Sequence, residues 1–371
     1  MHPETLAVHA GRGVDPQTGA VAPSISLSTT FERDADGGYE RGYEYARSAN
    51  PTRQTLEECI AQLEGGTSAA AFASGSAASL AVFLLADPGG HIIATEDAYH
   101  GTLKQLHEIL VRWGVELTRV DTTDIDAVRA AFRDNTKLLW IESPSNPLLN
   151  IADLQKLSEI AHQAGVLAVC DSTFATPILQ QPLQLGCDFV VHSATKYLGG
   201  HSDICGGVVV GRDEQTFEPI RGYQNRAGSV PSPFDCWLLL RSISTLPCRI
   251  EKQSANASRI ASYLNNHSGV ERVFYPGLSD HPGHALAKQQ MAAPGAMLSF
   301  CVNGAREEAF TVAAKTKLFI RATSLGGVES LIEHRASIEG ENTFAPENLL
   351  RLSVGIEHPD DLINDLEQAL S

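Results

Sequence analysis

The sequence has few basic residues, with 28 lysines and arginines against 44 aspartates and glutamates and a formal net charge of −16 at pH 7. Such an excess of negative charge disfavours nucleic acids and anionic membranes as partners, because both repel it. It does not disfavour a small anionic ligand, since one site can be locally basic. Hydrophobic residues make up 43% of the 371 residues, which is ordinary for a globular protein with a sizeable core.

Paired cysteines are missing as well. The seven cysteines are an odd number and none is arranged as Cys-x-x-Cys, so neither a zinc ribbon nor a disulfide framework is indicated. His201, Asp203 and Cys205 alternate, but structural zinc sites use closer pairs, and we predict no metal there. Reduced, buried cysteines are typical of a cytoplasmic enzyme, which is the localisation that we expect.

Long uninterrupted hydrophobic runs are also absent. The most apolar stretch, residues 69–86, contains Ser74, Gly75, Ser76 and Ser79. It therefore indicates a strand, a glycine turn and a helix rather than a membrane span. The first residues have neither the basic cluster nor the apolar run of a signal peptide, so none is predicted.

Strand-like and helical patterns alternate from Pro51 onward. Such alternation predicts an α/β fold with a mostly parallel, seven-stranded sheet that is covered on both faces. The last two predicted strands are joined by a loop too short for a helical crossover, so we expect one of them to be antiparallel. The predicted strands are 69–73, 91–95, 115–120, 137–141, 166–170, 188–192 and 207–210.

Three regions differ in pattern. Residues 1–47 lack periodicity and are rich in Gly, Pro, Ser and Thr, which predicts an extended N-terminal arm. Residues 48–233 contain the strand–helix alternation and form the predicted ligand-binding domain. Residues 234–371 begin with two long helical patterns and continue with the segments 270–275, 296–302, 318–323 and 349–354, which are typical of a smaller α+β domain.

Two of the predicted strands end on polar residues that suggest chemistry. The strand 188–192 is followed by a glycine-rich loop that contains Lys196, and ligands bind at such carboxyl ends in open α/β sheets. Desolvation and nearby cations can lower the pKa of a lysine there, which makes its amine a nucleophile. The strand 166–170 ends at Asp171, whose buried carboxylate needs a partner, and the protonated pyridine nitrogen of pyridoxal phosphate could supply it.

Seven short segments agree with one family pattern, in order, along nearly the whole chain. They are residues 45–52, 72–75, 142–147, 171–174, 192–203, 324–327 and 350–355. With these segments, the chain resembles the pyridoxal-phosphate enzymes of cysteine and methionine metabolism, which include cystathionine γ-synthases and cystathionine γ-lyases. The resemblance implies a fold-type I transferase that uses pyridoxal 5′-phosphate.

The resemblance also implies roles for individual residues. Lys196 would bind the cofactor covalently and move protons, Asp171 would hold the pyridine nitrogen, and Tyr99 would stack on the ring and protonate the leaving group. The implied cofactor contacts are Tyr45, Arg47, Ser74, Gly75, Ser76, Tyr99, Asn146, Asp171, Ser193, Thr195 and Lys196. The implied substrate contacts are Tyr45, Asn146, Thr323, Ser324 and Arg351, with the Arg351 guanidinium binding the substrate carboxylate.

The arm is expected to act between subunits. In the family, the matching segment crosses a subunit interface and supplies Tyr45 and Arg47 to the phosphate site of the neighbour. The resemblance therefore implies a homotetramer built from two active dimers.

The sequence departs from the family pattern around the expected substrate pocket. Thr323 replaces a glutamate that in many members attracts a distal amine, and His100 replaces a usual glycine. Gly101 stands where methionine γ-lyases have cysteine. The segment after Ser330 is shorter than usual and reads His334-Arg335-Ala336-Ser337, without the familiar Met-Thr-His. We expect these differences to alter the preference for cystathionine or cysteine.

The leading functional hypothesis is γ-replacement on an O-acyl-homoserine with a thiol such as cysteine, as in cystathionine γ-synthases. An alternative is γ-elimination of the cystathionine γ-lyase or methionine γ-lyase type, which gives a 2-oxo acid, ammonia and a thiol. An aminotransferase forms another class, distinguished by its need for a second 2-oxo acid. A cofactor-binding regulator without turnover is disfavoured, because every implied catalytic position is filled.

Overall fold

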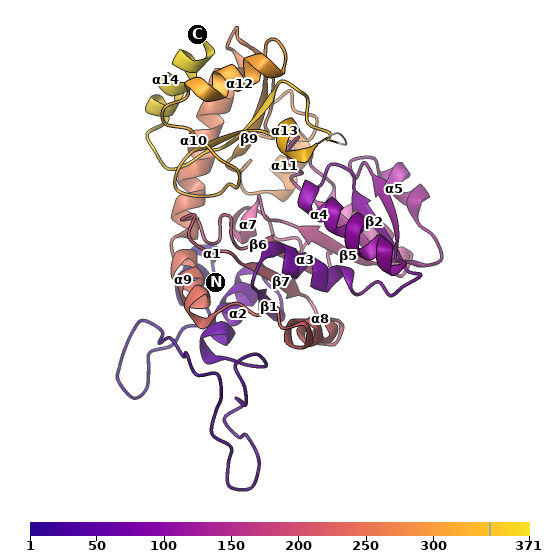
Figure 1. Cartoon of the computed structure of the whole chain (residues 1–371), viewed down its shortest axis with the longest axis vertical. Coiled ribbons are helices and arrows are strands. Elements are labelled where there is room, and N and C mark those ends of the chain that lie inside the picture. Colours follow the sequence, from indigo (N-terminus) through magenta and orange to yellow (C-terminus); the bar gives the residue numbers. More distant parts are fainter. Residues whose placement is uncertain (341–342) are drawn as a thin grey trace.

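The computed structural model describes residues 1–340 and 343–371. Two sheets organise it, a seven-stranded sheet and a five-stranded sheet that lies above it in Figure 1. Helix α10 (Leu246–Asn265) links them. Its first turns bury Leu246 and Ile250 with helices of the larger sheet, whereas Ile260 and Leu264 pack in the core of the smaller sheet.

The larger sheet is mostly parallel, as predicted. Its order is β1-β7-β6-β5-β4-β2-β3. Only β7 runs antiparallel to its neighbours β1 and β6, which confirms the expected antiparallel strand. The seven strands are β1 (Ser68–Phe72), β2 (His91–Thr95), β3 (Glu116–Val120), β4 (Thr136–Glu142), β5 (Leu167–Asp171), β6 (Phe189–Ser193) and β7 (Gly207–Gly211).

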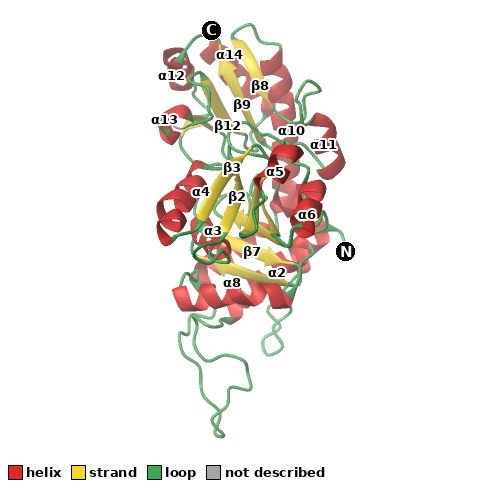
Figure 2. Cartoon of the chain, turned by 90° about the vertical axis from the view of Figure 1, so that its right-hand side faces the viewer, coloured by secondary structure: helices red, strands yellow, loops and turns green. Residues whose placement is uncertain are grey.

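Helices cover both faces of this sheet, with α3 and α4 on one side and α5 and α6 on the other (Figure 2). The apolar faces of the helices make the contacts: Leu154, Leu157 and Ile160 of α6 are buried in one cluster. Gly65, with φ 70°, ends α2. The helices of this part are α1 (Pro3–His9), α2 (Pro51–Glu64), α3 (Gly75–Phe83), α4 (His100–Gln105), the π and 3₁₀ turns η1 (Leu106–Leu110) and η2 (Val111–Trp113), α5 (Ile125–Ala131), α6 (Leu154–Gln163), α7 (Thr176–Leu179), α8 (Glu214–Ala227) and α9 (Pro233–Ile243).

The smaller sheet has the order β10-β11-β12-β9-β8 and is mostly antiparallel. Its strands and helices are β8 (Val270–Phe274), α11 (His284–Gln290), β9 (Met297–Val302), α12 (Arg306–Lys315), β10 (Ile320–Arg321), β11 (Leu331–His334), α13 (Ala336–Glu339), β12 (Leu349–Ser353) and α14 (Pro359–Leu370).

Two strands of the smaller sheet differ from the sequence-based expectation. β10 has two residues instead of the six expected over 318–323. Before it, the backbone N–H groups of Leu318 and Phe319 donate to the Asp365 carboxylate instead of to a neighbouring strand, and after it the chain turns at Ser324, where φ is 82°. β11 was not predicted. All four of its residues are buried, so it lacks the alternation of polar and apolar residues that identifies a half-buried strand.

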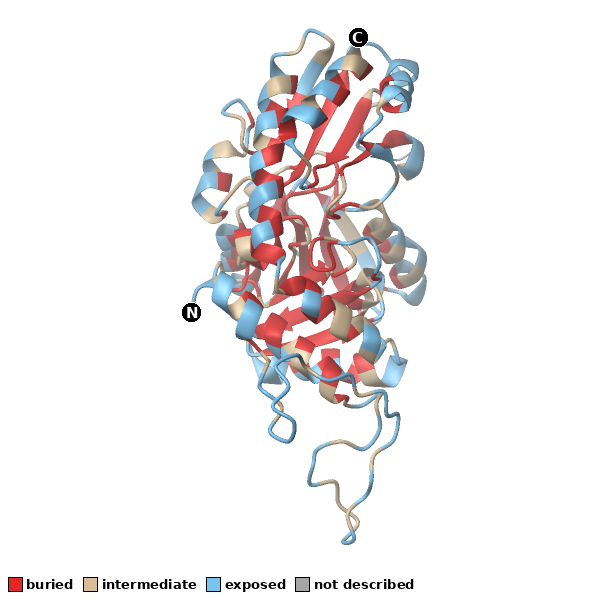
Figure 3. Ribbon diagram, turned by 90° about the vertical axis from the view of Figure 1, so that its left-hand side faces the viewer, coloured by how far each residue is buried: buried red, intermediate tan, exposed pale blue. Residues whose placement is uncertain are grey.

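The N-terminal region is not extended throughout. Residues Pro3–His9 form α1, because Ala7 and Ala10 are buried in a cluster with residues of α2. The chain then leaves the body as long loops, drawn at the bottom of Figure 1, whose residues are largely exposed in Figure 3. The division of the chain at residues 48 and 234 stays a prediction.

Several general features complete the fold. All seven cysteines have free thiols. Within residues 1–340 and 343–371, every helix is too short or too polar to cross a membrane. In the same described part, three or more His, Cys, Asp or Glu side chains never gather closely enough to hold a metal ion.

Candidate active site

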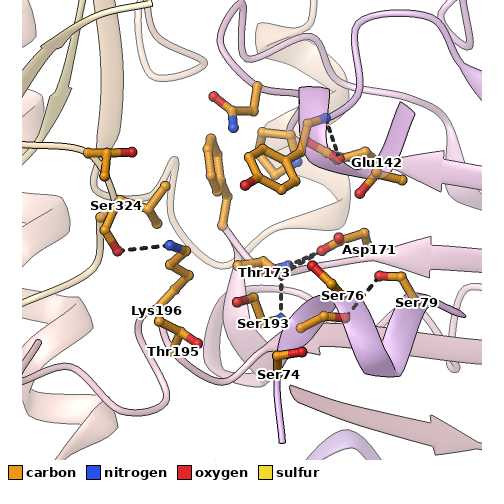
Figure 4. Close-up of a pocket in the computed structure, with 18 of the residues that line it drawn as sticks. Ser74, Ser76, Ser79, Glu142, Asp171, Thr173, Ser193, Thr195, Lys196 and Ser324 are labelled. Carbon is orange, nitrogen blue, oxygen red and sulfur yellow. Dashed lines mark hydrogen bonds between the residues drawn. The ribbon is translucent and has the colours of Figure 1, made fainter. Parts of the chain in front are cut away.

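One pocket collects most of the predicted site residues at the carboxyl ends of β4, β5 and β6, where the larger sheet faces the smaller one. Twelve of the fourteen line it, and Tyr45 and Arg47 do not. Figure 4 shows Lys196 and Ser324 on one side of the pocket and Glu142 and Asp171 on the other. The twelve are Ser74, Gly75, Ser76, Tyr99, Asn146, Asp171, Ser193, Thr195, Lys196, Thr323, Ser324 and Arg351.

The start of α3 forms one wall. The Ser74 hydroxyl caps this helix by accepting the N–H of Ala77 at 3.1 Å. A Cβ at Gly75 would lie 2.8 Å from Cβ and Oγ of Ser193, so glycine lets the helix begin close to the end of β6. The positive end of the helix and the nearby hydroxyl groups suit a phosphate.

Asp171 ends β5 inside the pocket. Its Oδ1 accepts hydrogen bonds from the backbone N–H of Thr173 at 3.0 Å and from the Thr173 hydroxyl at 2.5 Å. Burial raises the pKa of Asp171, although the bonds from Thr173 act in the opposite direction. Among the residues that the structure describes, no Lys, Arg or His forms an ion pair with Asp171, so its charge needs a cationic ligand.

Glu142, for which no role was predicted, lies beside Asp171 at the matching position of β4. Burial raises its pKa well above the usual range, and the neighbouring Asp171 adds to the shift. Both effects favour the neutral form of this carboxyl group. Its Oε2 accepts the backbone N–H of Tyr99 at 2.9 Å, so Glu142 positions the backbone that presents the Tyr99 ring.

The amine of Lys196 lies opposite these carboxyl groups. Its Nζ donates to the hydroxyl of Ser324 at 2.8 Å. Burial lowers the pKa of Lys196 to about 8, and the nearby Arg351 cation also lowers it. A larger fraction of neutral amine is therefore present than for an ordinary lysine. Ser324 has φ 82°, a left-handed conformation that non-glycine residues adopt only at a cost and often at functional sites.

Arg351 lies on β12 with 3% of its side chain exposed. Its guanidinium donates to Asn146 Oδ1 at 2.9 Å, to the carbonyl of Ser324 at 3.0 Å and to Glu333 Oε2 at 2.7 Å. Burial lowers the pKa of Arg351 to about 10, so it is charged at pH 7. A held guanidinium fork of this kind suits a carboxylate.

The ring of Tyr99 contacts or closely approaches the two residues that follow it, His100 and Gly101. Its ring meets the ring of His100 edge-on, with the centroids 4.7 Å apart. A Cβ at Gly101 would lie 2.4 Å from Cε1 of Tyr99, so only glycine leaves this ring in place. The cysteine of methionine γ-lyases would require a different position of Tyr99.

Tyr45 and Arg47 lie on the exposed loops rather than in this pocket. Arg47 donates to the carbonyl of Asn225 at 3.1 Å, and its guanidinium carbon is 5.7 Å from the centroid of the Tyr45 ring. Their action in a neighbouring subunit stays a prediction.

Sequence reasoning missed Arg335, which also lines the pocket. It is almost fully buried, and its guanidinium binds Glu333, Glu339 and His100. The one signal for it was the unusual segment 334–337, which marked a changed region but assigned no role to the arginine.

Comparisons with known proteins agree with this geometry. Cystathionine gamma-synthase of Mycobacterium tuberculosis is 48% identical over 99% of this chain and 96% of the relative. Cystathionine gamma-lyase of Bacillus subtilis is 47% identical, covering 100% and 99%. The crystal structure of metB from Corynebacterium glutamicum superimposes with a TM-score of 0.98 at 43% identity, covering 100% of this chain and 98% of that chain.

A sequence model of one family matches almost the whole chain, residues 4–371, and its description is Cys/Met metabolism PLP-dependent enzyme. With the relatives above, it confirms the predicted fold class and cofactor. The chain therefore belongs to the family of pyridoxal-phosphate-dependent enzymes of cysteine and methionine metabolism, the family of the cystathionine synthases and lyases.

Proposed function

We propose that the protein catalyses γ-replacement on an O-acyl-L-homoserine, with L-cysteine or another thiol as the second substrate. In this reaction the bond between Cγ and the acyl oxygen breaks and a bond between Cγ and sulfur forms. The carboxylate leaves with the electron pair of the broken bond, and the thiol proton is released. The observation behind the proposal is one pocket that contains a lysine of lowered pKa, a strand-end carboxyl group and a buried carboxylate-binding arginine.

The residues of the pocket fit pyridoxal phosphate. Asp171 has the raised pKa of a carboxyl group that lacks a charged partner, and Gly75 leaves room at the start of α3 for a phosphate. Asp171 would bind the pyridine nitrogen, and Ser74, Ser76, Ser193 and Thr195 would surround the phosphate. When bound, the cofactor supplies an electron sink for the carbanion that forms at the substrate Cα.

Lys196 performs the proton transfers in the proposed reaction. A pKa of about 8 places its amine close to neutral pH, where one group can both accept and return a proton. The Ser324 hydroxyl, at 2.8 Å, keeps the amine in the pocket. Arg351 binds the α-carboxylate and so orients Cα toward Lys196. Tyr99 donates a proton to the departing oxygen and takes one back from the thiol, and the released acid then loses its proton to water, so that a carboxylate and a proton are released overall.

The assembly belongs to the same proposal. The described cations that line the pocket are Lys196, Arg335 and Arg351. Each has a hydrogen-bond partner other than the residues proposed to surround the phosphate. A phosphate dianion therefore calls for one more cation. Arg47 of a neighbouring chain would supply it, with Tyr45, in a homotetramer of two active dimers. The free thiols of all seven cysteines suit a cytoplasmic site of action.

γ-Elimination is the second candidate, because a relative that is 47% identical is named cystathionine gamma-lyase. Thr323 does not separate the two reactions. Its neutral hydroxyl lines the pocket where many members have a glutamate for the distal amine, and that amine is present in both cystathionine and cysteine. An aminotransferase would have the same lysine, aspartate and arginine but would release no thiol or carboxylic acid.

A product balance on the purified holoenzyme tests the proposal. O-Succinyl-L-homoserine and O-acetyl-L-homoserine are each supplied with L-cysteine, and L-cystathionine is supplied alone. Cystathionine, 2-oxobutyrate, ammonia and thiol are quantified. We expect cystathionine to be the main product from an acylated homoserine. Turnover of cystathionine to 2-oxobutyrate at a higher kcat/KM would identify a γ-lyase instead, and a requirement for a second 2-oxo acid would identify an aminotransferase.

A further inference from the structure

The pocket contains a second guanidinium group beside the one proposed to bind the α-carboxylate. Arg335 follows β11, has 1% of its side chain exposed and lines the pocket together with Arg351. Both arginines donate to the same oxygen, Oε2 of Glu333, at 2.7 Å each. Two cations thus flank one carboxylate, and Glu333 itself does not line the pocket.

The described hydrogen-bond partners of Arg335 do not line the pocket. Glu339 accepts from Nε at 3.0 Å and from a terminal nitrogen at 2.8 Å, and Nδ1 of His100 lies 3.2 Å from that nitrogen. Glu339 and His100 line a separate outer hollow, next to Lys104 and Phe344. Glu339, one of the two described carboxylates paired with Arg335, therefore borders the outer hollow, whereas Arg335 itself lines the pocket.

This arrangement combines two departures from the family pattern. His100 begins α4 and Arg335 lies between β11 and α13, and the two side chains contact each other. Accepting a bond from a guanidinium requires Nδ1 of His100 to be unprotonated, and burial, followed by the Arg335 charge, lowers the His100 pKa accordingly. A neutral His100 accepts a hydrogen bond from the Arg335 guanidinium and, being uncharged, does not attract an anionic ligand away from it.

One guanidinium is sufficient for one α-carboxylate, and Arg351 already has that position with Asn146 and the Ser324 carbonyl. The acidic residues on the described pocket wall, Glu142 and Asp171, end the neighbouring strands β4 and β5 and lie across the pocket from Lys196 and Ser324 in Figure 4. Of the four described charged side chains in this cluster, the two arginines line the pocket, whereas their partners Glu333 and Glu339 do not. The neutral Thr323 adds no anion to this part of the wall.

We propose that Arg335 selects substrates whose γ-substituent ends in a carboxylate. The inference rests on the proposed function and specifies its substrate class. Two sources fit this chemistry: the acyl group of a dicarboxylic homoserine ester such as the succinyl ester, and the carboxylate of the cysteine that replaces it. A neutral acetyl or alkylthio tail offers no carboxylate to Arg335, whose anionic partners among the described residues are then Glu333 and Glu339 alone.

Binding of unreactive analogues tests the selection independently of turnover. L-2-Aminosuberate matches cystathionine with a methylene in place of sulfur and without the distal amine, and L-2-amino-octanoate is its neutral counterpart. Each is titrated into the holoenzyme while the cofactor absorbance is followed. We expect the dicarboxylate to bind at least about tenfold more tightly, as one charge-assisted hydrogen bond allows.

The main variant is Arg335→Gln/Glu339→Gln, which removes one cation and its outer anion together and leaves the Arg351–Glu333 pair balanced. It should bind both analogues with similar Kd. Arg335→Lys, which keeps the charge but loses the fork, should retain part of the preference. Arg119→Gln removes an exposed cation near the same outer hollow and should leave the preference unchanged.

Two kinetic arms separate the sources. One compares O-succinyl- with O-acetyl-L-homoserine, with hydrosulfide as the thiol, and the other compares L-cysteine with cysteamine on O-acetyl-L-homoserine. If Arg335→Gln/Glu339→Gln lowers the kcat/KM of the succinyl ester relative to the acetyl ester, Arg335 contacts the leaving group. If the variant lowers the kcat/KM of cysteine relative to cysteamine, Arg335 contacts the acceptor. Equal Kd values for the two analogues in the wild type, or an unchanged ratio in Arg335→Gln/Glu339→Gln, would overturn the inference. A binding preference without replacement activity would instead count against the proposed function alone.

Discussion

At the scale of single residues, the protonation of Lys196 determines what the pocket can do. Burial and the Arg351 cation both disfavour the charged amine, and the Ser324 hydroxyl holds the side chain at 2.8 Å. The lysine thus reaches its reactive, neutral form about two and a half pH units below an ordinary lysine, whose pKa is about 10.4.

The reaction of the apoprotein with pyridoxal phosphate should show this shift. Because a folded pKa of about 8 lies below the usual value, the neutral amine increases as the pH rises toward 8 and is predominant above it. We expect the rate constant for cofactor binding to rise with pH, to be half-maximal near pH 8 and to level off beyond it. Stopped-flow absorbance measures this rate, and a rate that still rises steeply above pH 10 would show an unshifted lysine.

Thr323 is the second residue with a specific consequence. A glutamate there would attract the distal amine of cystathionine, and a charge-assisted hydrogen bond contributes roughly 1.5–3 kcal/mol. Thr323→Glu should therefore raise kcat/KM for cystathionine, relative to the uncharged γ-thioether ethionine, by about ten- to a hundredfold. Steady-state kinetics with both substrates checks this, and an unchanged ratio would show that position 323 does not contact the distal amine.

At the scale of elements, helix α2 holds the end of the arm. Arg53 of α2 has 4% of its side chain exposed, and its guanidinium donates to the carbonyls of Ala46, Arg47 and Ser48 at 2.8–3.2 Å. These carbonyls belong to the segment that presents Arg47. The geometry of the arm thus depends on a side chain of the domain that it leaves.

Removing the hydrogen bonds of Arg53 should loosen the arm and destabilise the protein. Arg53→Met leaves the three carbonyls without their charged donor, and we expect the free energy of unfolding to fall by about 2–3 kcal/mol. Urea denaturation measures the change. Arg129→Met, at an exposed ion pair with Asp126, is the control and should alter the stability by less than about 0.5 kcal/mol. Equal changes in the free energy of unfolding for the two variants would show that the hydrogen bonds of Arg53 do not stabilise the protein.

A helix or strand could be predicted where its residues form a recognisable pattern of apolar and polar side chains. The strands that end at Asp171 and just before Lys196 could be predicted, because they are short apolar runs bounded by polar residues. β11 could not, since it is four residues long and wholly buried. The contact between His100 and Arg335 joins residues 235 positions apart in the chain, and no local pattern indicates such a pair.

At the scale of the whole molecule, the two sheets contribute different parts of one pocket. The larger sheet supplies Asp171, Lys196 and the wall at α3, and the smaller sheet supplies Arg351 and Arg335. Arg47 lies outside the pocket, on loops that leave the body of the chain (Figure 1). The proposed complete site therefore needs two copies of the chain.

Mixed oligomers should demonstrate this sharing. Lys196→Ala and Arg47→Ala chains are unfolded together and refolded at equal amounts. A two-fold dimer that contains one of each has one site with both residues intact, so about a quarter of the wild-type sites should be restored. A mixture of Lys196→Ala with Asp171→Ala is the control and should stay inactive, since both residues lie in the pocket of one chain. Without recovery in the first mixture, Arg47 does not act between subunits.

The most direct test of the account is the identity of the lysine that binds the cofactor. The holoenzyme is reduced with borohydride, digested and mapped by mass spectrometry. We predict that the reduced pyridoxyl group is found on the peptide that contains Lys196, and that Lys196→Ala loses both the label and the turnover. A label on another lysine, or full activity of Lys196→Ala, would contradict the assignment of this pocket as the active site.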